Sequence, residues 1–209
     1  MSAPPAPADG VPADGDAAWV SVETPFDAAA LSVLVADVEG MLRVNPYLEF
    51  QEWREIEPGR YKFRARNLSN QQAIDTVVRV ERTADATLLH YESGLKTRTV
   101  FRIEPGVAGA RLVITDDYGG TPAAEREARV AEVDRSLLAW GGDLYRYFRD
   151  WRRWSWLGPW RWYMRRVWRV MKPTARRIAF MLWMVTLFEI ASVALIVAVF
   201  ALELDKYIF

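Results

Sequence analysis

Residues 60–83 read RYKFRARNLSNQQAIDTVVRVERT and contain two segments in which apolar and charged side chains alternate. Arg60–Asn67 places apolar side chains on one face and a row of cations on the other, namely Arg60, Lys62, Arg64 and Arg66. Gln72–Thr83 repeats the pattern, with Ile74, Thr76, Val78 and Val80 facing one way. Because successive side chains of a strand point to opposite faces, this period of two predicts two β-strands. One apolar face and one charged face predict a sheet that is covered on one side only.

The segments on either side of this pair extend the predicted sheet. Strand patterns recur in Trp19–Thr24, Leu48–Glu57, Thr87–Gly94, Thr97–Glu104 and Ala110–Tyr118. The connections from Leu48 onward are short, and Pro58-Gly59 and Pro105-Gly106 are typical turn pairs. Short connections between consecutive strands predict an antiparallel meander.

Two helical segments are expected between the first strand and this meander. Asp27 is a candidate N-cap for a helix over Ala28–Asp37, and Glu39–Val44 continues it after a break near Gly40. Asn45-Pro46 then ends the helical segment, because the residue before a proline disfavours the helical conformation.

A long closing helix is predicted over Pro122–Asp150. Thr121 suits the N-cap and proline suits the first helical position. Apolar side chains recur at spacings of three and four, so we expect this helix to cover the open face of the sheet. The pair Gly141-Gly142 predicts either a kink or a place of close packing within it.

Charge is unevenly distributed along the 209 residues, although 27 basic and 27 acidic side chains sum to zero. Residues 1–150 hold 17 basic and 24 acidic side chains, a net charge of −7. Residues 151–188 hold 9 basic side chains and no acidic one, and residues 189–209 carry a net charge of −2. The zero total excludes a uniformly basic coat for nucleic acid, and the distribution isolates one strongly cationic segment.

That segment, residues 151–177, reads WRRWSWLGPWRWYMRRVWRVMKPTARR and contains six tryptophans. Tryptophan favours the headgroup level of a bilayer, and arginine pairs with lipid phosphate. We therefore expect an interfacial amphipathic segment that binds anionic headgroups through Trp151, Trp154, Trp156, Trp160, Arg161, Tyr163, Arg165, Arg166, Trp168, Arg169 and Lys172. Binding of nucleic acid, another use of interleaved basic and aromatic residues, is disfavoured by the apolar run that follows. Docking on a partner membrane protein stays open.

Ile178–Leu202 is a run of 25 mostly apolar residues interrupted by Glu189 alone. A helix of this length exceeds a hydrocarbon core of about 30 Å, so we expect a single transmembrane helix. The basic flank precedes it, and the positive-inside rule then places residues 1–177, the bulk of the chain, on the cytoplasmic side. Glu189 is expected either to contact another helix or polar group, or to lie protonated in the span.

No catalytic or metal-binding motif is recognisable. The chain has no cysteine and one histidine, His90, which excludes thiolate chemistry, disulfides and multi-histidine metal sites. His90 fits a structural or surface role. Asp116-Asp117 fits a turn, because neighbouring strand residues point to opposite faces and do not easily share a proton. We therefore predict no catalytic residue, no metal and no cofactor.

The order of elements resembles the helix-grip fold of the START-like/polyketide-cyclase superfamily, often called SRPBCC. The opening strand ending in Val22–Phe26, the helix pair, Asn45-Pro46 leading into Leu48–Trp53, and the closing helix carry the resemblance. It implies an α+β domain whose curved antiparallel sheet grips the long helix around an apolar cavity, in a superfamily whose members bind lipids, sterols, polyketides or other hydrophobic molecules. The cavity-facing residues that it implies are Phe50, Tyr61, Phe63, Ile74, Thr76, Val78, Phe101, Ile103, Leu112, Ile114, Val133, Leu137, Leu144 and Phe148. The alternative is that these side chains fill a solid core.

The predicted organisation is a disordered leader at 1–16, a helix-grip domain at 17–150, an interfacial segment at 151–177, a transmembrane helix at 178–202 and a short tail at 203–209. Our first hypothesis is a membrane-anchored, non-enzymatic binding module for a hydrophobic ligand, lipid or isoprenoid-like. The second is an accessory or assembly subunit of a larger membrane complex. The third is a cyclase- or hydratase-like enzyme acting on a membrane-soluble substrate, for which Thr76, Tyr61, Asp116 and His90 are the available polar groups.

Overall fold

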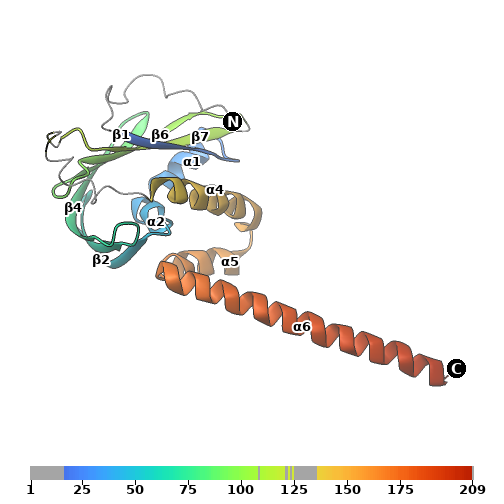
Figure 1. Ribbon diagram of the computed structural model, residues 1–209. Coiled ribbons are helices and arrows are strands. Elements are labelled where there is room, and N and C mark those ends of the chain that lie inside the picture. Colours follow the sequence, from blue (N-terminus) through green and yellow to red (C-terminus); the bar gives the residue numbers. More distant parts are fainter. Residues whose placement is uncertain (1–16, 108, 121, 123, 125–135, 209) are drawn as a thin grey trace. The chain divides into compact units, whose positions relative to one another are not determined.

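The computed structural model describes residues 17–107, 109–120, 122, 124 and 136–208 (Figure 1). The chain forms two compact units, Met1–Val170 and Met171–Phe209. The helices of the first unit whose bounds the described residues give are α1 (Ala28–Val35), α2 (Val38–Arg43), α4 (Leu137–Trp154), α5 (Gly158–Tyr163) and the π-helical turn η2 (Met164–Trp168). The predicted leader and most of the N-terminal half of the predicted closing helix, including Val133, lie outside the described residues.

One seven-stranded antiparallel sheet, with the order β1-β7-β6-β5-β4-β3-β2, forms the framework of the first unit. Its strands are β1 (Ala17–Glu23), β2 (Leu48–Glu57), β3 (Arg60–Asn67), β4 (Ala73–Arg82), β5 (Ala86–Tyr91), β6 (Arg98–Pro105) and β7 (Ala110–Asp117). From β2 to β7 each strand pairs with the next one in sequence, which confirms the predicted meander. The opening strand β1 pairs with β7, so β1 and β2 are the two edges of the sheet.

The sheet curves, and the helices α2 and α4 lie on its concave side (Figure 1). Phe63 pairs with Thr76, and Tyr61 pairs with Val78, so the apolar alternation of β3 and β4 shares one face, as predicted. This face carries the core: Phe63 is 2% exposed and Val78 is fully buried. The sheet and α4 together make the α+β helix-grip architecture expected from the order of elements.

Two short helices connect β1 to β2. Asp27 caps α1 as predicted, because its Oδ1 accepts a hydrogen bond of 2.7 Å from the backbone N–H of Ala30. Asp37 caps α2 in the same way, accepting from the N–H of Gly40 at 2.9 Å. The predicted break near Gly40 is therefore wrong: the break comes earlier, where an aspartate supplies the N-cap, and Gly40 lies inside α2.

Helix α4 packs against β1 and covers part of the concave face. The closest approach is at Gly141, where a Cβ would lie 2.6 Å from the Cγ2 of Val20. Beside it, the buried Trp140 donates its indole N–H to the backbone carbonyl of Met41 at 3.0 Å. Of the two roles predicted for Gly141-Gly142, the structure shows close packing, because α4 continues without interruption through the pair.

The tryptophan-rich segment folds back onto α4 within the first unit. Trp168 stacks on Tyr147 with ring centres 6.1 Å apart, and Trp160 packs against Trp151 at 5.5 Å. Met164, which lies between Trp160 and Trp168 in the sequence, is buried. This corrects the expectation that Trp151 lies at a membrane interface: it is 8% exposed and belongs to the core of the unit, because α4 extends beyond residue 150.

The end of this segment is tied to α2. The turn η2 is π-helical, and the N–H of Arg169 donates to the carbonyl of Met164 at 3.2 Å. The guanidinium of Arg169 then forms an ion pair with Asp37, the N-cap of α2. The C-terminal end of the first unit is therefore held by both aromatic stacking and an ion pair.

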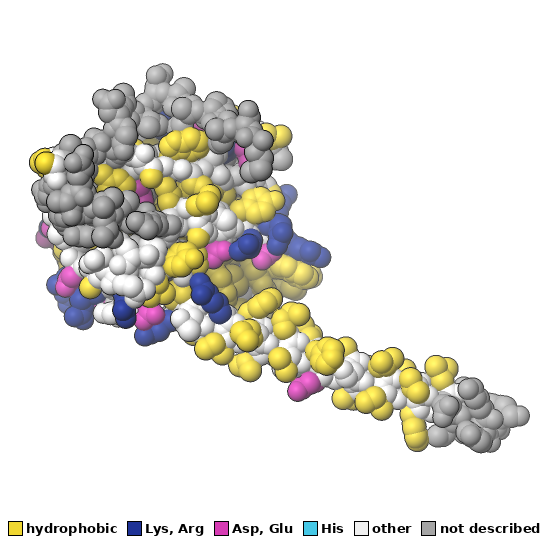
Figure 2. All heavy atoms as spheres, viewed as in Figure 1, with side chains coloured by type: hydrophobic (Ala, Val, Ile, Leu, Met, Phe, Trp, Pro, Cys, Tyr) yellow, Lys and Arg dark blue, Asp and Glu magenta, His cyan; other side chains and the backbone are white. Residues whose placement is uncertain are grey.

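The second unit contains one long helix, α6 (Pro173–Ile208). Apolar side chains occupy its visible face along the described length (Figure 2). Its portion Pro173–Leu202 is long and apolar enough to cross a membrane, and its most apolar window has no buried residue. The predicted span at 178–202 lies inside this helix. That it crosses a membrane stays a prediction.

Candidate functional site

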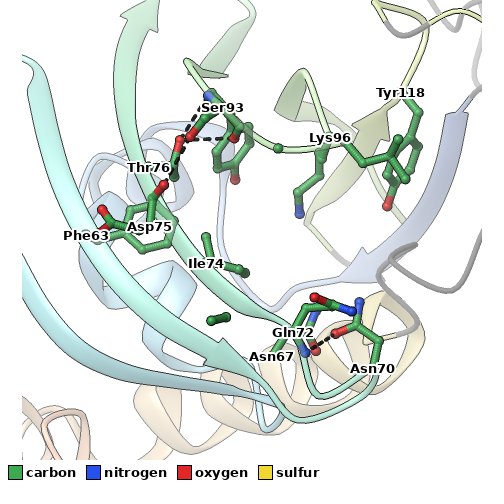
Figure 3. Close-up of a pocket in the computed structure, with 14 residues that line it drawn as sticks. Phe63, Asn67, Asn70, Gln72, Ile74, Asp75, Thr76, Ser93, Lys96 and Tyr118 are labelled. Carbon is green, nitrogen blue, oxygen red and sulfur yellow. Dashed lines mark hydrogen bonds between the residues drawn. The ribbon is translucent and has the colours of Figure 1, made fainter. Parts of the chain in front are cut away.

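A pocket of about 330 Å³ opens at the end of the concave face where β3 ends and β4 begins (Figure 3). It is lined by Phe63, Asn67, Asn70, Gln72, Ala73, Ile74, Asp75, Thr76, Tyr91, Ser93, Gly94, Leu95, Lys96 and Tyr118. Phe63, Leu95 and Tyr118 are buried, whereas Gln72, Asp75 and Ser93 are exposed. The pocket therefore combines an apolar, buried part with a polar, exposed part.

Turn chemistry shapes two walls of the pocket. At the end of β3, the Oδ1 of Asn67 accepts from the backbone N–H and the hydroxyl of Ser69, at 2.9 and 2.7 Å. Gly94 reverses the chain between β5 and β6 with a φ of 113°, a conformation that L side chains rarely adopt. The Oγ1 of Thr76 accepts from the N–H of Ser93 at 3.2 Å, which ties this connection to β4.

Lys96 joins the pocket to a buried polar cluster. Its Nζ lies 3.1 Å from the Oδ2 of Asp116, whose side chain is 1% exposed. The side chain of Lys96 extends toward the open centre of the pocket (Figure 3). Thr99 donates its hydroxyl to the other carboxylate oxygen of Asp116 at 2.5 Å. Because Thr99 has one hydroxyl proton, Tyr91 is the donor in its 3.1 Å contact with Thr99. A buried carboxylate is stable only when paired and hydrogen-bonded in this way.

The neighbouring Asp117 has separate partners on the other face of β7. Its Oδ2 lies 2.7 Å from the Nε of Arg98, and its Oδ1 accepts from the N–H of Gly119 at 2.8 Å. The two carboxylates therefore do not form a proton-sharing pair, as the alternation of strand side chains predicts. Asp117 also has the turn role that its position before Gly119 predicts.

The structure divides the fourteen residues that the resemblance implies for a cavity. Phe63, Ile74 and Thr76 line the pocket. The other described members pack in or against the core: Phe50, Tyr61, Val78, Phe101, Ile103, Leu112, Ile114, Leu137, Leu144 and Phe148. Phe101, for example, meets the ring of Trp140 edge to face at 5.7 Å. These side chains contact one another, and Val133 lies outside the described residues.

The polar side chains that the sequence offered for an enzyme, Thr76, Tyr61, Asp116 and His90, do not converge. Tyr61 stacks on Trp53 with ring centres 5.2 Å apart, and does not line the pocket. Burial, and after it the carboxylate of Glu55, raises the pKa of Tyr61. His90 pairs in register with Arg79 on the face opposite the core, where its Nε2 lies 3.2 Å from Glu81. Only Thr76 and Asp116 remain near the pocket and its polar cluster.

Sequence reasoning missed Tyr91, Lys96 and Tyr118 as pocket residues. They come from the end of β5, the β5–β6 connection and the residue after β7, and only the strand register brings them together. The sequence held one signal for Lys96. This lysine follows Gly94 by two residues, in the turn before a predicted strand, and the next predicted strand of the meander ends in Asp116-Asp117.

The eleven residues predicted to lie at a membrane interface differ in exposure. Trp154, Trp156, Arg161, Arg165, Arg166 and Lys172 are exposed, Trp160, Tyr163, Trp168 and Arg169 are half-buried, and Trp151 is buried. Trp162, absent from that prediction, is 62% exposed. The helical period correctly grouped Trp160 and Trp168 on one face, but this face packs on α4 of the same unit.

The cationic row of β3 is largely neutralised by neighbouring acids. Arg60 pairs with Glu57 and Glu92, Lys62 lies 3.9 Å from Asp75, Arg64 lies 2.8 Å from Glu52, and Arg66 donates to Gln71. The hydrogen bonds that Arg60 donates to Glu57 and Glu92 raise the pKa of its guanidinium. This row is an ion-paired, solvated outer face of the sheet.

No protein-family model and no curated protein matches the chain. Solved structures that are similar include a Rhodobacter sphaeroides protein, 13% identical with a TM-score of 0.47 over 67% of this chain and 96% of that one. The di-domain ARO/CYC StfQ of the steffimycin biosynthetic pathway is 12% identical, with a TM-score of 0.46 over 66% of this chain and 52% of that one. An AHSA1-like protein from Aeromonas hydrophila is 10% identical, with a TM-score of 0.36 over 59% and 90%. At these identities and scores, the similarity assigns no activity or ligand.

Proposed function

We propose that this chain is a membrane-anchored module that binds a small hydrophobic ligand with a polar end, without performing chemistry on it. The observation that carries the proposal is the pocket of about 330 Å³ at the open end of the concave face. Its volume lies within the range of small-molecule sites, which are mostly apolar with a few placed polar groups. Phe63, Ile74 and Leu95 suit an isoprenoid-like or other hydrocarbon part.

The charges around the pocket favour an uncharged polar end on the ligand. Among the described lining residues Lys96 is the cation, and Asp116 at 3.1 Å balances it. A ligand carboxylate would compete with Asp116 for this cation, whereas a hydroxyl or carbonyl oxygen accepts a hydrogen bond without adding charge. Asn67 and Gln72 supply further polar atoms in the lining.

The membrane anchor in this proposal is α6. Its apolar length supports a single span, and the basic residues before it support a cytoplasmic position for residues 1–177. Resistance of the chain to alkaline extraction from membranes tests the anchor. A reporter that is active only outside the cytoplasm, fused after Phe209, tests the orientation, because an inactive fusion contradicts it.

Ligand binding is tested with two variants of β4. Ile74 lines the pocket, whereas Val77 points to the opposite face of the same strand, where it pairs with Lys62. The full chain is purified in mild detergent, and the small molecules that accompany it are extracted and identified by mass spectrometry. We expect Ile74→Trp to retain about tenfold less ligand than wild type, and Val77→Trp to retain the wild-type amount. Equal retention in both variants, or repeated recovery of an empty wild-type chain, contradicts the proposal.

A further inference from the structure

The outward side of the tryptophan-rich segment carries side chains that the packing of the first unit leaves exposed. We call it the arginine–tryptophan surface; it consists of Arg152, Arg153, Trp154, Trp156, Arg161, Trp162, Arg165 and Arg166. Trp156 is 72% exposed. The residues come from the end of α4, the connection to α5, α5 itself and η2.

The five arginines of this surface have no acidic partner among the described residues. Within the part of the chain that the structure describes, no carboxylate oxygen lies within ion-pair distance of any of them. Arginines one or two turns earlier on α4 are different, because Arg146 lies 2.8 Å from Asp143 and Arg149 lies 3.4 Å from Asp150. Three cations of β3, Arg60, Lys62 and Arg64, also have acidic partners. The arginine–tryptophan surface is therefore a concentrated positive charge that the fold does not neutralise.

The six tryptophans of residues 151–177 are divided between two roles. Trp151, Trp160 and Trp168 pack against the unit and hold the segment in place. Trp154 and Trp156, together with Trp162, remain open to solvent. An indole ring in water is unfavourable, but at the headgroup level its apolar part is buried and its N–H stays hydrated. Exposed indoles beside unpaired guanidinium groups match a layer of lipid phosphates over hydrocarbon.

We propose that the arginine–tryptophan surface docks on the headgroups of an anionic bilayer, as a second contact beside the span. This inference rests on the membrane anchor proposed above. Arg166 precedes Pro173 by seven residues, which cover at most about 25 Å when fully extended. The surface is therefore tethered near the bilayer that holds α6, whatever the arrangement of the two units. Docking fixes the orientation of the first unit, and therefore of the pocket, relative to the membrane from which a hydrophobic ligand comes.

A fluorescent label on the full chain tests this proposal. The chain contains no cysteine, and a Cβ at Gly158 meets no atom of the described residues within 4 Å, so Gly158→Cys accepts an environment-sensitive fluorophore beside the surface. The labelled chain is reconstituted in nanodiscs of phosphatidylcholine, with or without phosphatidylserine. We expect a blue-shifted emission in the phosphatidylserine discs that is reversed in about 1 M salt, where the Debye length falls to about 3 Å.

Charge-matched variants identify the residues responsible. Arg161→Gln with Arg166→Gln removes two unpaired cations and is expected to lower the ratio of docked to undocked chains about 30-fold, at about fivefold for each arginine near an anionic surface. Arg146→Gln with Arg149→Gln removes two cations that already have acidic partners and is expected to leave this ratio nearly unchanged.

Several results overturn the inference. These are equal emission in both kinds of nanodisc, equal loss in the two double variants, or an emission shift that appears with an oligonucleotide and not with anionic lipid. Absence of the chain from the disc fraction refutes the anchor instead. The labelled chain is then mixed with phosphatidylserine vesicles. Co-sedimentation that is lost in the Arg161→Gln, Arg166→Gln variant supports docking by the arginine–tryptophan surface. Co-sedimentation that persists in this variant overturns the inference.

Discussion

Alanine at Gly141 is expected to destabilise the first unit, whereas alanine at the adjacent Gly142 is expected to stabilise it. In the middle of a helix, alanine is favoured over glycine by about 0.5–1 kcal/mol, and this gain applies at both positions. At Gly142 a Cβ meets no atom of the described part of the chain within 4 Å, so the gain is realised in full. At Gly141 the same atom would lie 2.6 Å from the Cγ2 and 3.3 Å from the Cγ1 of Val20.

The clash at Gly141 has no inexpensive relief. Val20 is β-branched and belongs to β1, so its side chain has few alternative rotamers. Overpacking of this kind costs about 1–3 kcal/mol, which exceeds the helical gain. We therefore expect Gly141→Ala to lower the free energy of unfolding by about 1–2 kcal/mol. For a domain of this size, that corresponds to a melting temperature about 2–8 °C lower.

Thermal unfolding of the full chain in mild detergent, followed by circular dichroism, measures both effects. A double-mutant cycle with Val20→Ala isolates the contact, because in that background Gly141→Ala no longer meets the valine methyls and is expected to become neutral or stabilising. The reasoning is refuted if Gly141→Ala stabilises the chain as much as Gly142→Ala does, or if Val20→Ala leaves the cost of Gly141→Ala unchanged.

Two further predictions concern the contacts that hold the tryptophan-rich segment. Burial raises the pKa of Tyr147 above its ordinary value of 10.0. The contribution of Tyr147 to stability is therefore constant at lower pH and is lost as pH rises through the folded-state pKa. Denaturation midpoints measured from about pH 8 upward should fall less steeply with pH in Tyr147→Phe than in wild type, and an unchanged slope contradicts this. Arg169→Gln removes the partly exposed ion pair with Asp37, which is worth about 1 kcal/mol or less. The rate of amide hydrogen exchange in residues 158–168 should therefore rise up to about fivefold, while the exchange rates in β5 and β6 stay unchanged. Uniform acceleration over the whole unit would instead indicate global destabilisation.

The faces of the sheet could be predicted from sequence because alternation decides them locally. Phe63 and Ala65 alternate with charged neighbours, and a strand has only two ways to orient such a pattern. The cap of α1 was predictable for a similar reason, since Asp27 lies three residues before the N–H that it accepts from. Features that depend on a periodic pattern within one helix or strand could therefore be predicted from the sequence.

The pocket could not be predicted in this way, because no single helix or strand contains it. Lys96 reaches Asp116 only through the turn at Gly94 and the pairing of β6 with β7, neither of which a periodic pattern specifies. The tryptophan-rich segment shows the same limit. Its period predicts which side chains share a face, but the partner of that face depends on Tyr147 and Asp37, which are distant in sequence from Trp168 and Arg169.

The π-helical turn η2 makes the length of this segment a constraint of its own. In an ordinary α-helix, residues four apart advance by about 40°, so Trp168 would drift by about 80° from Trp160. The wider turn at Met164–Trp168 takes up part of this drift, and Trp168 still reaches Tyr147. Related chains are expected to exchange the outward residues over evolution more freely than the packed ones, provided the cationic and aromatic character of this side is kept. Gain or loss of one residue between Gly158 and Pro173 would shift the whole segment out of phase, and is expected to be selected against.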